Sequence, residues 1–392
     1  MRVILAVFVL IGLAGCATTT TAPTGASGVA VEAEKRIQAG LVVKSYKADA
    51  SRLYRLAYPI YQSAAEICRS DKVGPSLGLI GVATLDTVPK DYKDAAQAEL
   101  GLAQGVSITF LPEYSAAAKS GLMVGDQVIG VGKTAIPIGR AGLSAFAKAA
   151  QSLDVTSMQV DVTVIRNGVQ VVVLVKPEIL PRIGLNYDPF TSMVNAFADG
   201  TSVNFTRGLL RSMPTDTSVS MVVAHELAHN CQGHIEAKKT NAMGGLALDI
   251  LAAAAGVNTQ GAFSKVAANA FSVDFEREAD YVGLYYLARA GVSISEARDA
   301  YRLLTTETGA ALTAGYGATH PANPERFVRM EATEKEIEAK RSALQPLVPE
   351  LRRKGKYARK KTTLGGGQAA GTPAASSASM VTFGDRRLLG DY

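Results

Sequence analysis

Two short motifs constrain this chain more than any other part, because their side chains have to meet in space. HELAH begins at His225, and EREAD begins at Glu276. Residues four apart lie on one face of a helix, so His229 joins His225 and Asp280 joins Glu276. Glu278, between the two acidic residues, should point away. We expect two helices that pack together with these faces toward each other.

The histidine pair is typical of a metal site. An HExxH string also occurs on ordinary amphipathic helices, but only four histidines occur in 392 residues and two of them fall here. A catalytic zinc takes three protein ligands and leaves one position to water. We therefore predict one Zn²⁺ per chain on His225, His229 and Glu276, with Glu226 as general base. Asp280 is expected to hold a histidine ligand by its outer ring nitrogen.

The residues around the two motifs carry a family resemblance. A metzincin would need a histidine where Ile235 stands. The order HELAH, an apolar stretch, EREADYVG and then THPANPER at 319–326 instead resembles the M48 zinc metallopeptidases. The resemblance covers roughly residues 180–335, including 194–210, which resembles the family's β-hairpin before the active-site helix. It implies the zinc ligands named above and a structural role for His234.

The resemblance adds two residues to the candidate catalytic set with Glu226 and Asp280. These are His320 and Arg326, from the HPxxxxR element. One hypothesis places His320 near the metal, where it stabilises the oxyanion or blocks the open position and keeps the enzyme latent. The alternative is that it only packs against the following helix.

The start of the chain predicts export and a membrane anchor. Arg2 precedes an apolar run that is too short to span a bilayer and ends in LAGC at 13–16, which resembles a bacterial lipobox. We expect residues 1–15 to be a signal peptide and Cys16 to be lipidated, with an ordinary signal peptide as the alternative.

The predicted location is the periplasmic face of the outer membrane of a Gram-negative bacterium, anchored by lipid. An aspartate at position 17 would resemble an inner-membrane retention signal, but this chain has Ala17. Cys68 and Cys231 are able to pair in an oxidising compartment, and the sequence leaves open whether they do.

The domain plan follows from composition and periodicity. Residues 16–46 are expected to hold the lipidated cysteine and a spacer. The peptidase domain is expected at 47–76 and 180–350, opening with a helix interrupted near Pro59. The fold class is α+β, a mainly helical zinc peptidase with a small β-rich domain inserted at 77–179.

The insertion resembles a PDZ domain. SAAAKSGLMVGD at 115–126 matches a PDZ helix and glycine turn, and two alternating strands flank Asn167 and Gly168, a hairpin signal. Such a domain captures peptides or C-termini by strand addition, and residues 77–82 are a candidate carboxylate loop. A small β-barrel without binding function is the alternative.

Two other segments have distinctive composition. Residues 241–256 are apolar but too short to span a bilayer, so we expect a core or lid helix. Residues 351–392 form a basic, low-complexity tail whose end is a candidate ligand for the chain's own PDZ-like groove. The basic run lacks aromatic interleaving and nucleic-acid motifs, so no nucleic-acid partner is predicted.

Together these features predict a membrane-anchored zinc endopeptidase. Its expected partners are unfolded or misassembled envelope proteins and peptides bound at the PDZ-like domain. One alternative is a PDZ adaptor or chaperone-like lipoprotein with a latent or structural metal site. A zinc hydrolase acting on peptidoglycan is a second, which no motif favours.

Overall fold

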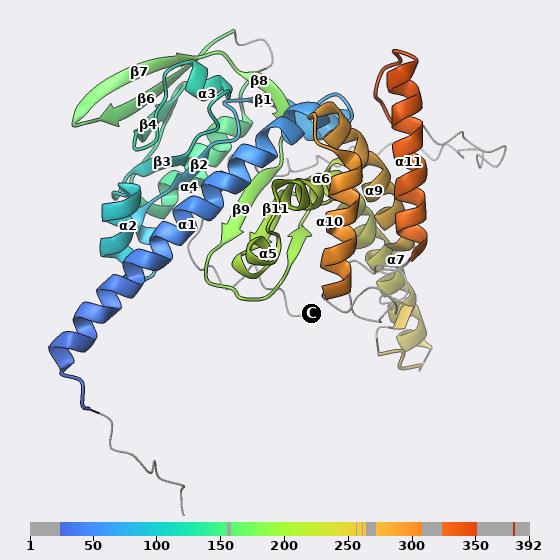
Figure 1. The fold of residues 1–392 in the computed structure, drawn as a ribbon, viewed down its shortest axis with the longest axis horizontal. Helices are drawn as coiled ribbons and strands as arrows, with labels where there is room; N and C mark the ends of the chain where they lie inside the picture. The colour runs from blue at the N-terminus through green and yellow to red at the C-terminus, as the bar shows by residue number, and fades with distance from the viewer. Residues whose placement is uncertain are drawn as a thin grey trace, which may run out of the picture.

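The computed structural model describes residues 24–154, 158–255, 257–260, 262–263, 272–307, 324–350 and 379–380. Helices and strands are mixed, which confirms the predicted α+β class. A strand-rich part and a mainly helical body both contact one long N-terminal helix, α1, which rises from the lower left in Figure 1. Cys16 and residues 351–378 and 381–392 lie outside the described residues, so the predicted lipid anchor and most of the tail are not placed.

Helix α1 spans Gly28–Ala64 and is longer than the sequence pattern predicted. The expected spacer at 16–46 is therefore helical from Gly28 onward, beginning where the Ser27 hydroxyl accepts a hydrogen bond from the Ala30 amide. The predicted interruption at Pro59 is wrong, because the helix continues through it. Tyr58 and Ile60 beside the proline are buried, and this packing offsets the missing backbone hydrogen bond.

The strand-rich part is a single antiparallel sheet with short helices around it. Its strands run in the order β2–β3–β4–β6–β7, and β5 pairs with β4. The elements are β2 (Gly81–Ala83), η2 (Leu85–Thr87), η3 (Lys90–Tyr92), α2 (Lys93–Leu100), β3 (Val106–Phe110), α3 (Ala116–Lys119), β4 (Gln127–Val131), β5 (Thr134–Ala135), α4 (Gly139–Gln151), β6 (Val160–Arg166) and β7 (Val169–Val175). A two-residue strand from the tail, β12 (Ser379–Met380), adds parallel to β2.

The hairpin predicted around Asn167 and Gly168 is confirmed. Strands β6 and β7 pair antiparallel from Val160 opposite Val175 to Arg166 opposite Val169. Both turn residues have positive φ, +51° for Asn167 and +78° for Gly168. A two-residue turn of this kind matches the right-handed twist of the paired strands.

Two hydrophobic clusters form the interior. One contains only residues from Leu77 to Val175, mainly from the sheet and helix α4. The larger one joins α1 to the helical body and also takes in the face of the strand-rich part that meets α1, including Leu79 and Phe110. The strand-rich part thus has its own core and is also packed onto the rest of the chain.

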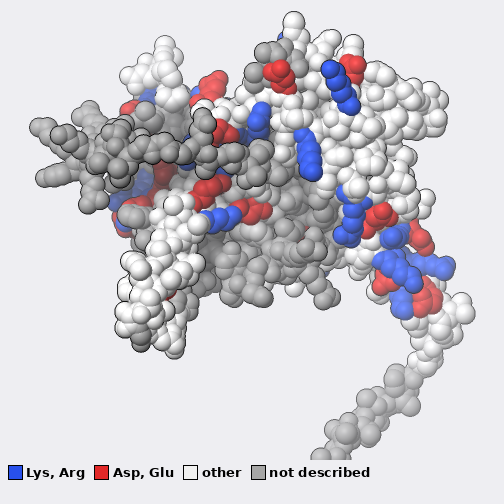
Figure 2. All heavy atoms as spheres, turned by 180° about the vertical axis from the view of Figure 1, so that it is seen from behind, with Lys and Arg blue, Asp and Glu red and all other residues white. Residues whose placement is uncertain are grey.

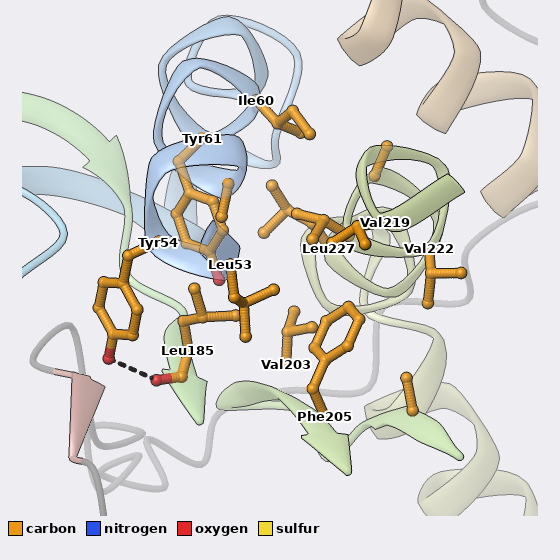
Figure 3. Packing of buried hydrophobic residues seen from close by; sticks show 14 of the residues in the cluster. Leu53, Tyr54, Ile60, Tyr61, Leu185, Val203, Phe205, Val219, Val222 and Leu227 are labelled. Atoms are coloured by element: carbon orange, nitrogen blue, oxygen red, sulfur yellow. Dashed lines mark hydrogen bonds between the residues drawn. The ribbon is translucent and has the colours of Figure 1, made fainter. Parts of the chain in front are cut away.

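The helical body is built around one buried helix, α6. The elements after the strand-rich part are β8 (Glu178–Pro181), β9 (Gly184–Asp188), β10 (Ala196–Ala198), β11 (Ser202–Thr206), α5 (Arg207–Ser212), α6 (Asp216–Gln232), α7 (His234–Ala254), α9 (Ser272–Arg289), α10 (Ile294–Glu307) and α11 (Pro324–Ser342). Between α1 and the strand-rich part lie η1 (Ser70–Lys72) and β1 (Val73–Ser76). Strand β1 pairs with β8. Strands β10–β11–β9 form a small sheet. Figure 3 shows Leu53 and Ile60 of α1, Phe205 of β11 and Leu227 of α6 packed together.

A search of the described helices for one long and apolar enough to cross a membrane found none.

A disulfide joins the segment that follows α1 to α6. Cys68 and Cys231 are bonded, with Cα atoms 4.8 Å apart and a sequence separation of 163. Cys231 is fully buried two residues after His229. The bond therefore fixes the C-terminal part of the buried helix against the segment that follows α1.

We predict that replacing Cys68 and Cys231 together with alanine lowers the free energy of unfolding by about 2–4 kcal/mol, because a long loop in the unfolded chain is no longer closed. Denaturant unfolding with and without reductant measures this. Reductant should shift the wild-type midpoint toward that of the double variant and leave the variant unchanged. Equal midpoints for the oxidised wild type and the variant would contradict the prediction.

Candidate active site

Helix α6 carries the HELAH motif through the interior. Every residue from Ser218 to Cys231 is buried, including His225, Glu226 and His229, each at most 2% exposed. The helix begins at a Thr215 cap, whose hydroxyl accepts from the Ser218 amide. It ends at Gly233, which has φ +75° and lets the chain reverse into α7. Burial of this whole helix fixes the direction of its polar side chains.

Helix α9 approaches α6 closely and brings EREAD to the histidines. A Cβ atom at Gly283 would lie 3.3–3.4 Å from backbone atoms of Ala224 and His225. Neither backbone can move without disturbing its helix, so the absence of a side chain at Gly283 permits this spacing. One turn earlier on α9 lies Asp280, and Glu276 lies a further turn back, both buried.

Three side chains converge as a possible metal site. Nε2 of His225 lies 3.2 Å from Nε2 of His229 and 3.3 Å from Oε2 of Glu276. Nε2 of His229 lies 3.4 Å from Oε1 of Glu276. All three ligand atoms lie within 4.8 Å of one another. Two imidazoles and one carboxylate are a donor set that suits a hydrolytic zinc ion, so these residues fit the predicted metal.

Asp280 and Arg326 lie behind His225. Oδ1 of Asp280 is 3.0 Å from Nδ1 of His225, the outer ring nitrogen. Arg326 of α11 donates two hydrogen bonds of 2.7 Å to Asp280, and its Nη1 lies 3.3 Å from Oε2 of Glu276. Tyr301 of α10 lies beside it, with its hydroxyl 3.3 Å from Nη2 of Arg326. Both predicted residues therefore orient the candidate metal ligands from outside, and we describe them as positioning residues.

The charges of this group support each other. Burial raises the pKa of Asp280, but the Arg326 guanidinium outweighs burial and holds that pKa below its usual value, so the carboxylate stays ionised. Burial also opposes a charge on His225, yet the neighbouring Tyr301 and the hydrogen bonds to Asp280 and Glu276 raise the pKa of the imidazole well above normal. The pocket around Nε2 of His225 therefore favours positive charge, whether from a proton or from a metal ion.

His229 is oriented by a separate pair, His234 and Glu278, whose contact with it the sequence analysis did not predict. Nδ1 of His234 lies 3.0 Å from Nδ1 of His229, and Nε2 of His234 lies 2.9 Å from Oε2 of Glu278. Phe275 stacks on the His234 ring at 4.6 Å. If His234 donates its Nε2–H to Glu278, its Nδ1 accepts a hydrogen bond from Nδ1–H of His229. Nε2 of His229 then carries a lone pair that is directed toward the candidate metal site.

This pair explains two features of the sequence. His234 was assigned a structural role, and its role is to orient His229. Glu278 does point away from the ligand face, as its spacing predicts, but toward His234. The turn at Gly233 brings His234 back over His229, and this is a tertiary effect that the motif spacing alone does not show.

The hairpin β10–β11 is fixed to the same helix. Asn230 of α6 is fully buried. Its amide nitrogen donates to the Ser202 carbonyl at 2.8 Å, and its oxygen accepts from the Gly200 amide at 2.7 Å. Strand β10, at one edge of the small sheet, therefore has a defined position beside α6. His320 lies outside the described residues, so neither hypothesis for it is tested.

We predict that Glu278→Gln and His234→Ala each lower zinc affinity by roughly 10–100-fold, because His229 loses its orienting partner. Competition with a chromophoric zinc chelator measures this without reference to activity. Glu331→Gln, at an exposed position on α11, is the matched control and should bind zinc as the wild type does. Wild-type affinity in both site variants would contradict the role assigned to this pair.

A second prediction concerns Arg326. Arg326→Met leaves Asp280 and Glu276 buried without their guanidinium, which should lower the free energy of unfolding by about 3–5 kcal/mol. Arg329→Met on the same helix is the control, since the Arg329 side chain is 57% exposed, and should change the free energy by less than about 0.5 kcal/mol. Thermal and denaturant unfolding compare the two, and equal losses would refute the argument.

Comparison with known proteins agrees with this geometry. The family model described as Peptidase family M48 matches residues 180–334, which include α6, α9, the hairpin and the start of α11. Among curated proteins, no match was found. Residues 180–334 of this chain therefore form a domain of peptidase family M48, which implies a metallopeptidase.

Proposed function

We propose that the protein is a zinc-dependent endopeptidase with its centre at His225, His229 and Glu276. The observation that carries the proposal is the convergence of these three donors, each oriented from outside by a buried partner, within a domain that matches a peptidase family. A purely structural metal site would not need Glu226, a carboxylate on the turn between the two histidines.

The chemistry is assigned to the chain's own residues. A zinc ion bound by the three donors would supply a Lewis acid that activates water and polarises the scissile carbonyl. Glu226 is buried beside His225 and is positioned to take a proton from the attacking water and pass it to the leaving amine. Asp280 and His234 keep the two imidazoles in the tautomer that presents Nε2.

Strand addition at β10 is the proposed mode of substrate binding. The strand is at the edge of its sheet and lies against α6, so an extended peptide paired with it would run past the histidines. Main-chain pairing is largely independent of side-chain identity. Such an enzyme would need unfolded or extended substrates, and misassembled envelope proteins fit that requirement.

We assign the strand-rich part, residues 77–179, as a PDZ-like domain that captures substrate or regulates access. Support comes from its separate hydrophobic cluster, the confirmed hairpin and the loop at 77–80 that leads into β2. The tail strand β12 pairs with β2 and lies close to α4 and β9. Because a strand and a helix flank this position, it is where a peptide ligand would be expected to bind.

The proposed location is the periplasmic face of the outer membrane, with lipid on Cys16. It rests on the lipobox resemblance, and the Cys68–Cys231 disulfide is consistent with an oxidising compartment. Within this location, quality control of envelope proteins is the proposed role. The alternative remains an adaptor whose metal site has no catalytic role.

Cleavage of casein by zinc-loaded protein tests the main proposal. We use residues 17–392, which include every described residue, and compare the wild type with Glu226→Gln. The wild type should cleave, and the variant should lose at least about 100-fold in rate while binding zinc normally. Cleavage by both would identify a contaminant or a misassigned site. Cleavage by neither, with zinc bound, would favour the adaptor.

A further prediction concerns the tail. Deleting residues 379–392 removes β12 from the edge of β2, and the apparent KM for casein should fall several-fold with kcat unchanged. Proline at both 379 and 380 should reproduce the effect, because proline cannot complete a strand ladder. An unchanged KM in both variants would show that the tail does not compete with substrate.

A further inference from the structure

Residues 240–255, 257–260 and 262–263, which we call the apolar hairpin, have an unusual composition for a surface segment. They comprise the end of α7 and the residues after it, and they contain a single charged side chain, Asp249. In Figure 1 the end of α7 extends beyond the helical body. From behind, the same projection is largely white, whereas Lys, Arg, Asp and Glu side chains are spread over the neighbouring surface (Figure 2).

Burial in this segment is the reverse of that expected in water. Asp249 is only 7% exposed, whereas the large apolar side chains are about half or more exposed: Met243 71%, Leu246 51%, Leu248 52%, Ile250 61%, Leu251 66%, Val257 56% and Phe263 46%. The sequence predicted a core or lid helix here, and the core alternative is wrong. An exposed apolar surface of this kind marks a site of interaction.

The single charge is satisfied inside the hairpin. The Asp249 carboxylate accepts hydrogen bonds from the Thr259 hydroxyl at 2.5 Å and from the Phe263 amide at 3.1 Å. Gly245, four residues earlier on the same face of α7, is the other buried residue of this part of the helix. The polar side of the hairpin therefore faces the returning segment, and the apolar side chains face outward.

We infer that the apolar hairpin docks into a lipid bilayer surface. Its helical part from Met243 to Ala254 is about 18 Å long at roughly 1.5 Å per residue, too short to span a hydrocarbon core about 30 Å thick, so it would lie at the bilayer surface. Lys238 and Lys239 directly precede it, at the position where they would meet anionic headgroups. An outward apolar surface with its one charge turned inward matches hydrocarbon better than it matches a protein partner, whose interfaces carry a polar rim.

The start of α1 supports the same orientation. Val29, Ile37 and Leu41 near its N-terminus are 84%, 58% and 62% exposed. In Figure 1 this end of α1 and the end of α7 both extend toward the lower side of the molecule. The predicted lipid on Cys16 precedes α1, so one membrane would contact both ends. Since α7 follows α6 and precedes α9 in the chain, docking would hold the candidate metal site near the membrane surface.

A tryptophan reporter tests the inference, because the chain contains no tryptophan. Leu251→Trp is placed in residues 17–392, which lack the signal peptide and the lipid. Mixed with vesicles of phosphatidylethanolamine and phosphatidylglycerol, its emission should shift to the blue and be quenched by lipids brominated on their acyl chains. Val328→Trp on α11 is the matched control, since Val328 is 67% exposed and Leu251 66%, and it should show neither change.

Cosedimentation with the same vesicles gives an independent measurement. Leu246→Glu combined with Leu251→Glu should lower vesicle binding roughly tenfold or more, whereas Val328→Glu should not. Circular dichroism checks that all three proteins are folded. Water-like emission from Leu251→Trp with vesicles present would overturn the inference. A blue shift caused by self-association or by unfolded casein without lipid would also overturn it, in favour of a protein-binding surface.

Discussion

The structure depends on a group of charges buried between helices α6, α9 and α11. His225, Glu276, Asp280 and Arg326 are each at most 3% exposed, and their hydrogen bonds and ion pairs connect all of them. Removing charges from water costs several kcal/mol per ion, and only good geometry with further hydrogen bonds offsets this. The close approach of α9 to α6 at Gly283 and the disulfide at Cys231 hold that geometry in place.

The two candidate metal histidines are oriented by different means. His225 contacts Asp280, whose own charge is fixed by Arg326 from a third helix. His229 contacts His234, which follows directly after the same helix and reaches Glu278 on α9. Both arrangements leave Nε2 directed toward the shared position. The site is thus specified by contacts from three helices, although its three candidate ligands come from two.

Three further features connect this site with its surroundings. The hairpin β10–β11 is fixed to α6 by Asn230, the strand-rich part shares α1 with the helical body, and the apolar hairpin interrupts the path from α6 to α9. The proposed peptide-binding strand and the proposed membrane-docking surface are therefore connected directly to the helices of the candidate site, and the strand-rich part is connected to them through α1. Such an arrangement suits an enzyme that acts on extended protein segments at a membrane.

The sequence by itself determined the residues of the candidate site, because HELAH and EREAD impose their own helical spacing whatever surrounds them. It also determined the turn at Asn167 and Gly168, where the residue types dictate positive φ. Tertiary structure decided what depends on distant contacts. Packing on both sides of Pro59 extended α1, the reversal at Gly233 brought His234 onto His229, and proximity in the fold made the Cys68–Cys231 bond possible. The exposure of the apolar face of α7 was likewise decided by the tertiary structure, because an apolar run in a sequence does not show whether it is buried or exposed.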